Sequence, residues 1–215
     1  FDLAFRDQDQ KIAAFGSSYR GKVFQIHREY RMKAWRSVLI ALSFLLLSGC
    51  LVTFKEPLTA SEPAPKGLLG KWSSTNAWGE PMNLELTRLG NDRYQAVTYF
   101  KAKPREREAY PFTVSRHGNR WYLSAKVPAQ YGGHFTIAGF ELTDKHELVV
   151  YNLDLEQINQ AIKQKALDGQ PFQADDGDGV QVDSSLDKVF AYLDDPANSD
   201  VFVEAVRYQR QARAK

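Results

Sequence analysis

Apolar and polar side chains alternate along much of the chain in short runs, and this alternation constrains the fold more than any other feature. The runs are rich in β-branched and aromatic residues and cover residues 84–86, 93–100, 110–114, 121–127, 134–142 and 147–153. Period-two alternation places successive side chains on opposite faces of a strand. Clusters of Gly, Asn and Asp between most of the runs indicate short turns, which favour antiparallel pairing. The pattern predicts an antiparallel meander of about six to eight strands, either a curved sheet or a small closed β-barrel.

Two stretches in the second half have a helical period instead. Apolar residues recur at three- and four-residue spacing within residues 155–166 and again within 186–193, which predicts two amphipathic helices. Residues 184–185 are both serine, an N-cap residue type, and Gly169 stands where the first helix is expected to stop. Residues 201–210 return to strand-like composition. The predicted fold class is therefore α+β, dominated by an antiparallel sheet or small barrel with two helices in the C-terminal half.

The second predicted helix has one apolar stripe, formed by Leu186, Val189, Phe190 and Leu193. We expect this stripe to pack on one face or one open end of the sheet, as amphipathic helices do. Phe190 is expected to be its deepest residue.

The first 54 residues contain the features of an export signal. Met32 begins a basic stretch that includes Lys33 and Arg36, an uncharged apolar run follows from Ser37 to Leu47, and small residues precede Cys50, the one cysteine of the chain. A basic segment, an apolar core of roughly 7–15 residues and small residues at a cleavage point are typical of secretory signal peptides.

The end of this segment, Leu47-Ser48-Gly49-Cys50, resembles the lipobox of bacterial lipoprotein precursors. In that family the cysteine receives a diacylglyceryl group, the chain is cut before it, and the new amine is acylated. The resemblance implies anchoring to a membrane by lipid on Cys50, since several acyl chains hold a protein firmly on a bilayer. An acidic residue after the cysteine commonly retains lipoproteins of two-membrane bacteria at the inner membrane. Leu51 therefore implies the outer membrane, on its periplasmic face.

An uncleaved transmembrane helix is the alternative interpretation of the same segment. The uncharged stretch from Ser37 to Phe54 has 18 residues, at the lower edge of a membrane span of about 20. Both interpretations export the rest of the chain.

These features divide the chain into four parts. Residues 1–31 show no clear period and are interpreted as an upstream extension without an assigned function, a genuine cytoplasmic tail being the alternative. Residues 32–49 form the signal peptide. Residues 50–67 form the lipidated cysteine and a Pro-rich tether, because such segments are semi-extended. Residues 68–215 are the predicted exported globular domain.

Gly70-Lys71-Trp72 opens this domain and resembles the Gly-X-Trp signature of lipocalin-like barrels, in which the tryptophan plugs one end. The resemblance implies a barrel that binds a small ligand or lipid. No arginine partner for the tryptophan is evident from spacing, although Arg207 and Arg210 on the last predicted strand are candidates. We consider Trp72, Trp121 and Tyr122 as ligand-binding residues. The alternative for Trp72 is a core residue of an edge strand.

No arrangement typical of catalysis or metal binding is found. The acidic run Asp175–Gly179 suggests calcium, but counted from Asp176 the sixth position is Gln181, where a glycine is required, and the twelfth is Asp187 rather than Glu. A solvated acidic turn is the simpler interpretation. The four histidines lack metal-binding spacing, and residues 184–185 lie outside any Gly-X-Ser-X-Gly motif. We predict no enzymatic activity, no metal and no cofactor.

The charge pattern bears on partners. A net charge of +2 argues against a nucleic-acid binder, while a basic tail from Arg207 to Lys215 suits anionic lipid headgroups or an acidic partner. The best prediction is a cell-envelope lipoprotein whose exported domain binds a small apolar ligand or lipid. The alternative is a scaffold or assembly partner acting through a protein-binding surface. A hydrolase is the third interpretation and requires a cleft that joins a nucleophile, a base and an acid. A wide apolar cavity favours the first, and a filled interior with an exposed aromatic patch favours the second.

Overall fold

The computed structural model describes residues 51–212 except 77, 91, 130–131 and 175–176. They form strands β1 (Leu51–Phe54), β2 (Gly70–Thr75), β3 (Pro81–Gly90), β4 (Arg93–Phe100), β5 (Glu108–His117), β6 (Arg120–Lys126), β7 (Phe135–Leu142), β8 (Glu147–Leu153), β9 (Gly169–Ala174), β10 (Gly177–Val182) and β11 (Phe202–Arg210). The helices are α2 (Leu155–Lys163), α3 (Leu186–Leu193) and the 3-10 helix η2 (Pro196–Val201).

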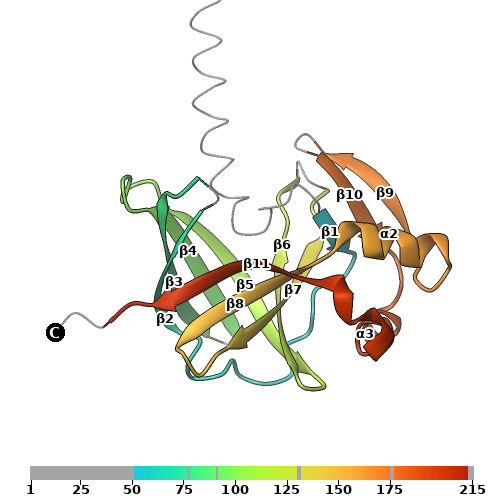
Figure 1. Ribbon diagram of the computed structural model, residues 1–215, viewed down its shortest axis with the longest axis horizontal. Helices are drawn as coiled ribbons and strands as arrows, with labels where there is room; N and C mark the ends of the chain where they lie inside the picture. The colour runs from blue at the N-terminus through green and yellow to red at the C-terminus, as the bar shows by residue number, and fades with distance from the viewer. Residues whose placement is uncertain (1–50, 77, 91, 130–131, 175–176, 213–215) are drawn as a thin grey trace, which may run out of the picture. The chain divides into compact units, whose positions relative to one another are not determined.

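Eight strands close into an antiparallel β-barrel (Figure 1). Their order is β6-β5-β4-β3-β2-β11-β8-β7, and β7 pairs back with β6. The last strand closes the barrel because it pairs with β8 along most of its length and with β2 through Gln209 and Arg210. The closed barrel, one of the two predicted architectures, is confirmed, and three further strands lie outside it.

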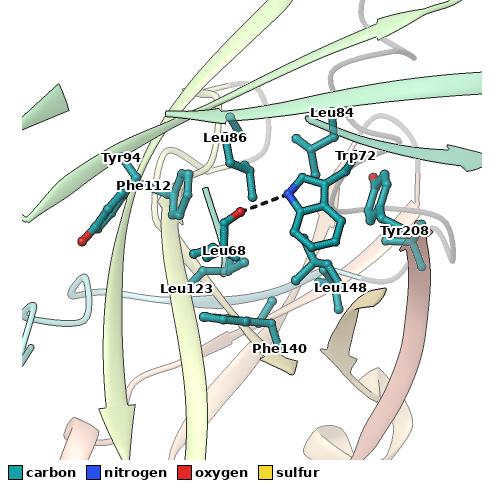
Figure 2. Close-up of a cluster of buried hydrophobic side chains, with 14 of the residues drawn as sticks. Leu68, Trp72, Leu84, Leu86, Tyr94, Phe112, Leu123, Phe140, Leu148 and Tyr208 are labelled. Carbon is teal, nitrogen blue, oxygen red and sulfur yellow. Dashed lines mark hydrogen bonds between the residues drawn. The ribbon is translucent and has the colours of Figure 1, made fainter. Parts of the chain in front are cut away.

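The barrel interior is filled by apolar side chains. On β3, for example, Met82, Leu84 and Leu86 are buried while the residues between them are more exposed, as period-two alternation requires. Figure 2 shows side chains from several strands pointing toward one another around Trp72. The buried members of this cluster are Leu68, Trp72, Met82, Leu84, Leu86, Tyr94, Ala96, Phe112, Val114, Leu123, Ala125, Ala138, Phe140, Leu148, Val150, Val206 and Tyr208.

A second apolar cluster forms outside the barrel, in a part that we call the annex. The annex consists of β1, β9, β10, α2, α3 and η2, and its helices and the β9–β10 hairpin lie together at one side of the barrel (Figure 1). Strand β1 pairs in parallel with β10 and contacts β7 through Phe54 and Phe135. Both helices bury apolar side chains here, together with Tyr122 and Ile137 from the outer face of the barrel.

Helix α3 agrees with the sequence pattern in its position and its cap. The Ser185 hydroxyl accepts a hydrogen bond from the Lys188 backbone N–H at 3.4 Å. The stripe packs in the annex, but the prediction that Phe190 is its deepest residue is wrong. Val189 and Leu193 are each 1% exposed, whereas Phe190 is 7% exposed. The Phe190 ring is less deeply buried because it stacks on His117, whose own side chain is partly exposed.

Helix α2 ends earlier than predicted. Its C-cap is Gln164, and Lys165 follows with a φ of 63°, a left-handed conformation that ends helices. Gly169 therefore begins strand β9 instead of stopping the helix.

The segment predicted as a tether belongs to the globular domain. Leu51–Phe54 is a buried strand, and Leu58 is 3% exposed. Residues 55–67 follow strand β5: the Thr113 hydroxyl donates to the Leu58 carbonyl at 3.1 Å, and the Ser61 hydroxyl accepts from a backbone N–H of that strand at 3.0 Å. The prolines keep this stretch extended, as predicted, but the extended chain packs against the barrel. We call residues 55–67 the strap.

The predicted signal peptide, the lipobox and Cys50 lie outside the described residues. So do Asp175 and Asp176 of the acidic run. Within the described part of the chain, no helix combines the length and apolar character needed to cross a membrane.

Candidate functional site

The two ends of the barrel differ in chemistry. The first end carries the start of β2, the end of β11 and the β3–β4, β5–β6 and β7–β8 turns, and we call it the tryptophan end. The opposite end carries the connections β2–β3, β4–β5 and β6–β7, and we call it the polar end.

Trp72 plugs the tryptophan end. Its ring is 1% exposed, and its Nε1 donates to the Leu68 carbonyl at 3.0 Å (Figure 2). The Arg210 guanidinium carbon lies 4.9 Å from the ring centroid. The same guanidinium donates to the carbonyls of Gly67 and Leu69, the latter at 2.7 Å. Of the two arginine candidates, Arg210 is thus the partner of Trp72, and the indole serves the core and is closed to a ligand.

A glycine is required at position 70, the first residue of β2, shortly after the end of the strap. Its φ is +136°, and a Cβ on it would lie 2.8 Å from Nη2 of Arg210. A side chain at this position would displace the guanidinium from the indole of Trp72. The glycine of the Gly70-Lys71-Trp72 sequence therefore makes room for the arginine.

Three polar side chains lie on the inner wall at the polar end. Ala96 on β4 and Phe112 on β5 belong to the interior cluster. Thr98, two residues after Ala96, shares its face, and Tyr110 and Glu108 share the face of Phe112. In the strand register Thr98 stands directly opposite Glu108. The three side chains form a polar patch on β4 and β5, just beyond the apolar filling.

The environment of these groups is unusual for polar side chains. Thr98 is 1% exposed, and its Oγ1 has no hydrogen-bond partner among the described residues. The Tyr110 hydroxyl donates to Oε2 of Glu108. Burial raises the pKa of Glu108, and this hydrogen bond partly opposes the rise. Burial and the neighbouring carboxylate both raise the pKa of Tyr110.

This arrangement suits binding. An unsatisfied buried hydroxyl costs about 1–3 kcal/mol, which a ligand atom within hydrogen-bond reach would offset. The Glu108 carboxyl accepts hydrogen bonds, and in its ionised form it pairs with a cation. Glu108 and Tyr110 are only partly buried, so solvent and solutes reach them.

The sequence contains a signal for this patch that the predictions did not use. Thr98, Glu108 and Tyr110 continue the phase of the inward-facing residues of their strands, so each is a polar residue at an apolar position. Such positions are exceptions to the alternation and mark candidate sites.

The other sequence-based candidates do not join this patch. Trp121 is half-buried, stacks on Phe140 at a centroid distance of 6.1 Å, and lines a cleft of about 620 Å³ that also involves Arg120 and Tyr151. Tyr122 is fully buried on the outer face of β6, where the edge of its ring meets the annex. Trp72, Trp121 and Tyr122 therefore do not form one ligand site.

The charged segments are also engaged locally. Arg207, at the start of the basic tail, pairs with Glu147 and Glu204, each at 2.7 Å. Residues 177–182 of the acidic region form strand β10, so they are not available as a calcium loop. No cluster of three or more metal-ligating side chains occurs in the described part of the chain.

Comparison of the chain with protein-family models, with curated proteins and with solved structures gives no match.

Proposed function

We propose that this protein is a cell-envelope lipoprotein whose barrel binds a small molecule at its polar end. The observation that carries the proposal is the buried, unpartnered hydroxyl of Thr98 opposite Glu108, which itself accepts a hydrogen bond from Tyr110. The Thr98 hydroxyl has hydrogen-bonding capacity that no described residue uses, and a carboxylate such as that of Glu108 can accept more than the one hydrogen bond from Tyr110.

The filled interior counts toward the assembly-partner alternative and against a ligand inside the barrel, so the proposed site is confined to the mouth. Phe112 and its neighbours in the interior cluster pack directly beyond the patch, so a ligand binds near the mouth and does not run through the barrel. The wall there combines a carboxyl group with the partly buried apolar ring of Phe100. This combination favours a small amphipathic amine, whose ammonium pairs with Glu108 and whose short apolar part lies against the rim.

Two probes of equal tail length test this preference. Hexylamine and hexanoate are titrated separately by calorimetry into the full chain, held in phosphatidylcholine nanodiscs. We expect hexylamine to bind and hexanoate not to bind, because Glu108 attracts the first charge and repels the second. The Glu108→Gln variant should lose the preference, while Glu62→Gln, at an exposed position on the strap, should keep it. Equal binding of both probes, or of neither, rejects the site.

The lipid anchor is a separate part of the proposal and rests on the Leu47–Cys50 sequence. Cys50→Ala should abolish metabolic labelling with palmitate and leave an uncut precursor. Fractionation of the wild-type protein should find it in the outer membrane, since Leu51 is not acidic. An unmodified Cys50 by intact-mass analysis of the membrane fraction contradicts the anchor and leaves the binding site untouched.

A second function, an assembly partner, is favoured by the cleft beside Trp121. Its lining combines Trp121, Tyr151 and Arg120, the residue types enriched at protein-binding hot spots. Trp121→Ala should then reduce recovery of cross-linked partners from intact cells, whereas Glu108→Gln should not.

A further inference from the structure

Trp78 is the most exposed large apolar side chain that the structure describes. It is 80% exposed, compared with 54% for Leu89 and 46% for Val203. Trp78 lies in the β2–β3 turn and Val203 near the start of β11, so both stand at the polar end of the barrel. An indole this exposed forgoes the favourable free energy of burying a large apolar surface.

The turn that carries Trp78 is held in shape by one buried side chain. Asn76 is 6% exposed, and its Oδ1 accepts from the backbone N–H groups of Trp78 and Glu80 at 3.0 and 2.9 Å. Its Nδ2 donates to the Glu80 carboxylate at 2.8 Å. The outward position of the indole is therefore built into a hydrogen-bonded turn.

A basic loop lies beside this turn. The β4–β5 connection, residues 101–107, carries four basic residues and one acid, and every residue in it is exposed. The loop adjoins the β2–β3 turn because the Lys101 N–H donates to the Pro81 carbonyl at 3.0 Å. Lys103 pairs with Glu106, whereas no ion pair is found for Lys101 or Arg105 within the described residues.

We propose that Trp78 and the basic loop form a docking surface for an anionic lipid bilayer. Indole rings favour the headgroup level of a membrane, and basic side chains near an anionic surface add roughly 1 kcal/mol each, about fivefold in binding. The docking surface does not depend on the proposed ligand site at Glu108 or on lipidation of Cys50.

Quenching of Trp78 fluorescence tests the docking surface. The full chain is reconstituted in vesicles of brominated phosphatidylcholine, with or without phosphatidylglycerol, and the signal of a Trp78→Phe variant is subtracted to isolate Trp78. We expect quenching by the brominated lipid, and loss of access to iodide, in the vesicles that contain phosphatidylglycerol. In neutral vesicles Trp78 should remain open to iodide.

Two matched charge variants separate docking from a general effect of charge. Lys101→Gln with Arg105→Gln should return the quenching to the level of neutral vesicles. Arg93→Gln with Lys145→Gln removes the same charge from exposed positions at the tryptophan end and should leave the quenching unchanged. If Trp78 stays open to iodide on both kinds of vesicle, or if the two double variants behave alike, the proposal is overturned. The first of these results would leave the surface to a protein partner.

Discussion

The Arg210 guanidinium lies over the Trp72 ring, 4.9 Å from its centroid, while it donates hydrogen bonds to carbonyls just before β2. One side chain of the last strand thus holds together the plug, the end of the strap and the seam that closes the barrel. The register of β2 with β11 covers only Gln209 and Arg210, and further contacts reinforce this seam. The Ser74 hydroxyl donates to the Arg207 carbonyl at 2.7 Å, and the Gln211 N–H donates to the Lys71 carbonyl at 2.9 Å.

Replacement of this arginine should weaken the closed barrel. Arg210→Met keeps an apolar stem over Trp72 but removes the hydrogen bonds and the cation–π contact, which together contribute about 1–3 kcal/mol at a partly exposed site. Urea denaturation should show a lower midpoint, equivalent to a loss of about 1–3 kcal/mol in the free energy of unfolding. Arg207→Met, which removes only surface ion pairs, should have a smaller effect. Equal midpoints for Arg210→Met and the wild type would contradict the role of the arginine.

The strap should contribute to stability as a core element does. Leu58 is almost fully buried, so Leu58→Ala should destabilise the domain by about 2–5 kcal/mol. The exposed Leu89 offers a matched control, and Leu89→Ala should stay within about 0.5 kcal/mol of the wild type. Thermal or urea unfolding of both variants measures the difference. If residues 55–67 were a free tether, Leu58→Ala and Leu89→Ala would change the free energy of unfolding by similarly small amounts.

The antiparallel strands were predictable from the sequence because their signals are local, whereas the choice between a curved sheet and a closed barrel was not. The β-branched and aromatic run 93–100 and the apolar run 147–153 were predicted with the bounds of β4 and β8. The last strand followed from composition alone. The annex was not predictable in this way. Leu51–Phe54 continues the apolar run of the signal segment, and its strand partner is β10, well over a hundred residues away. Short-range patterns carry no information about such a parallel pairing.

The candidate site was also predictable from the sequence only in part. Gly70 and Trp72 were singled out by their spacing, but the choice of Arg210 over Arg207 depends on the register of β11 with β2. In the sequence, Thr98 and Glu108 are ordinary polar residues of a strand. They are recognised as inward-facing only once it is known which face of each strand points into the barrel. Their opposition across two strands is a property of the register.

Helix α3 should anchor the annex through Phe190. Its ring stacks on His117 with centroids 4.1 Å apart, and the edge contact with Tyr122 has centroids 5.2 Å apart. Phe190→Ala should therefore cost about 3–5 kcal/mol, measured as a shift in the urea midpoint with an unchanged slope. An unchanged midpoint would mean that the helix lies loosely on the barrel.

Glu108 should make stability depend on pH. Burial raises its pKa in the folded protein above the ordinary value of 4.5, so the folded state binds more protons than the unfolded state between the two pKa values. The free energy of unfolding therefore falls as pH rises from below 4.5 through the folded pKa. Glu108→Gln keeps an acceptor for Tyr110 and should remove this part of the fall. The urea midpoints of the wild type and of Glu108→Gln are measured across that pH range. If the midpoints of the two proteins changed with pH in the same way, the raised pKa of Glu108 would be contradicted.

The most direct test of the binding site is the pKa of Glu108 itself, followed by carbon-13 NMR of its carboxyl group in the full chain. Without a ligand the pKa should lie above 4.5. Saturating hexylamine should lower it, because a bound ammonium favours the ionised carboxylate, while hexanoate should leave it unchanged. A carboxyl group that titrates at the same pH with and without hexylamine would contradict the proposed site.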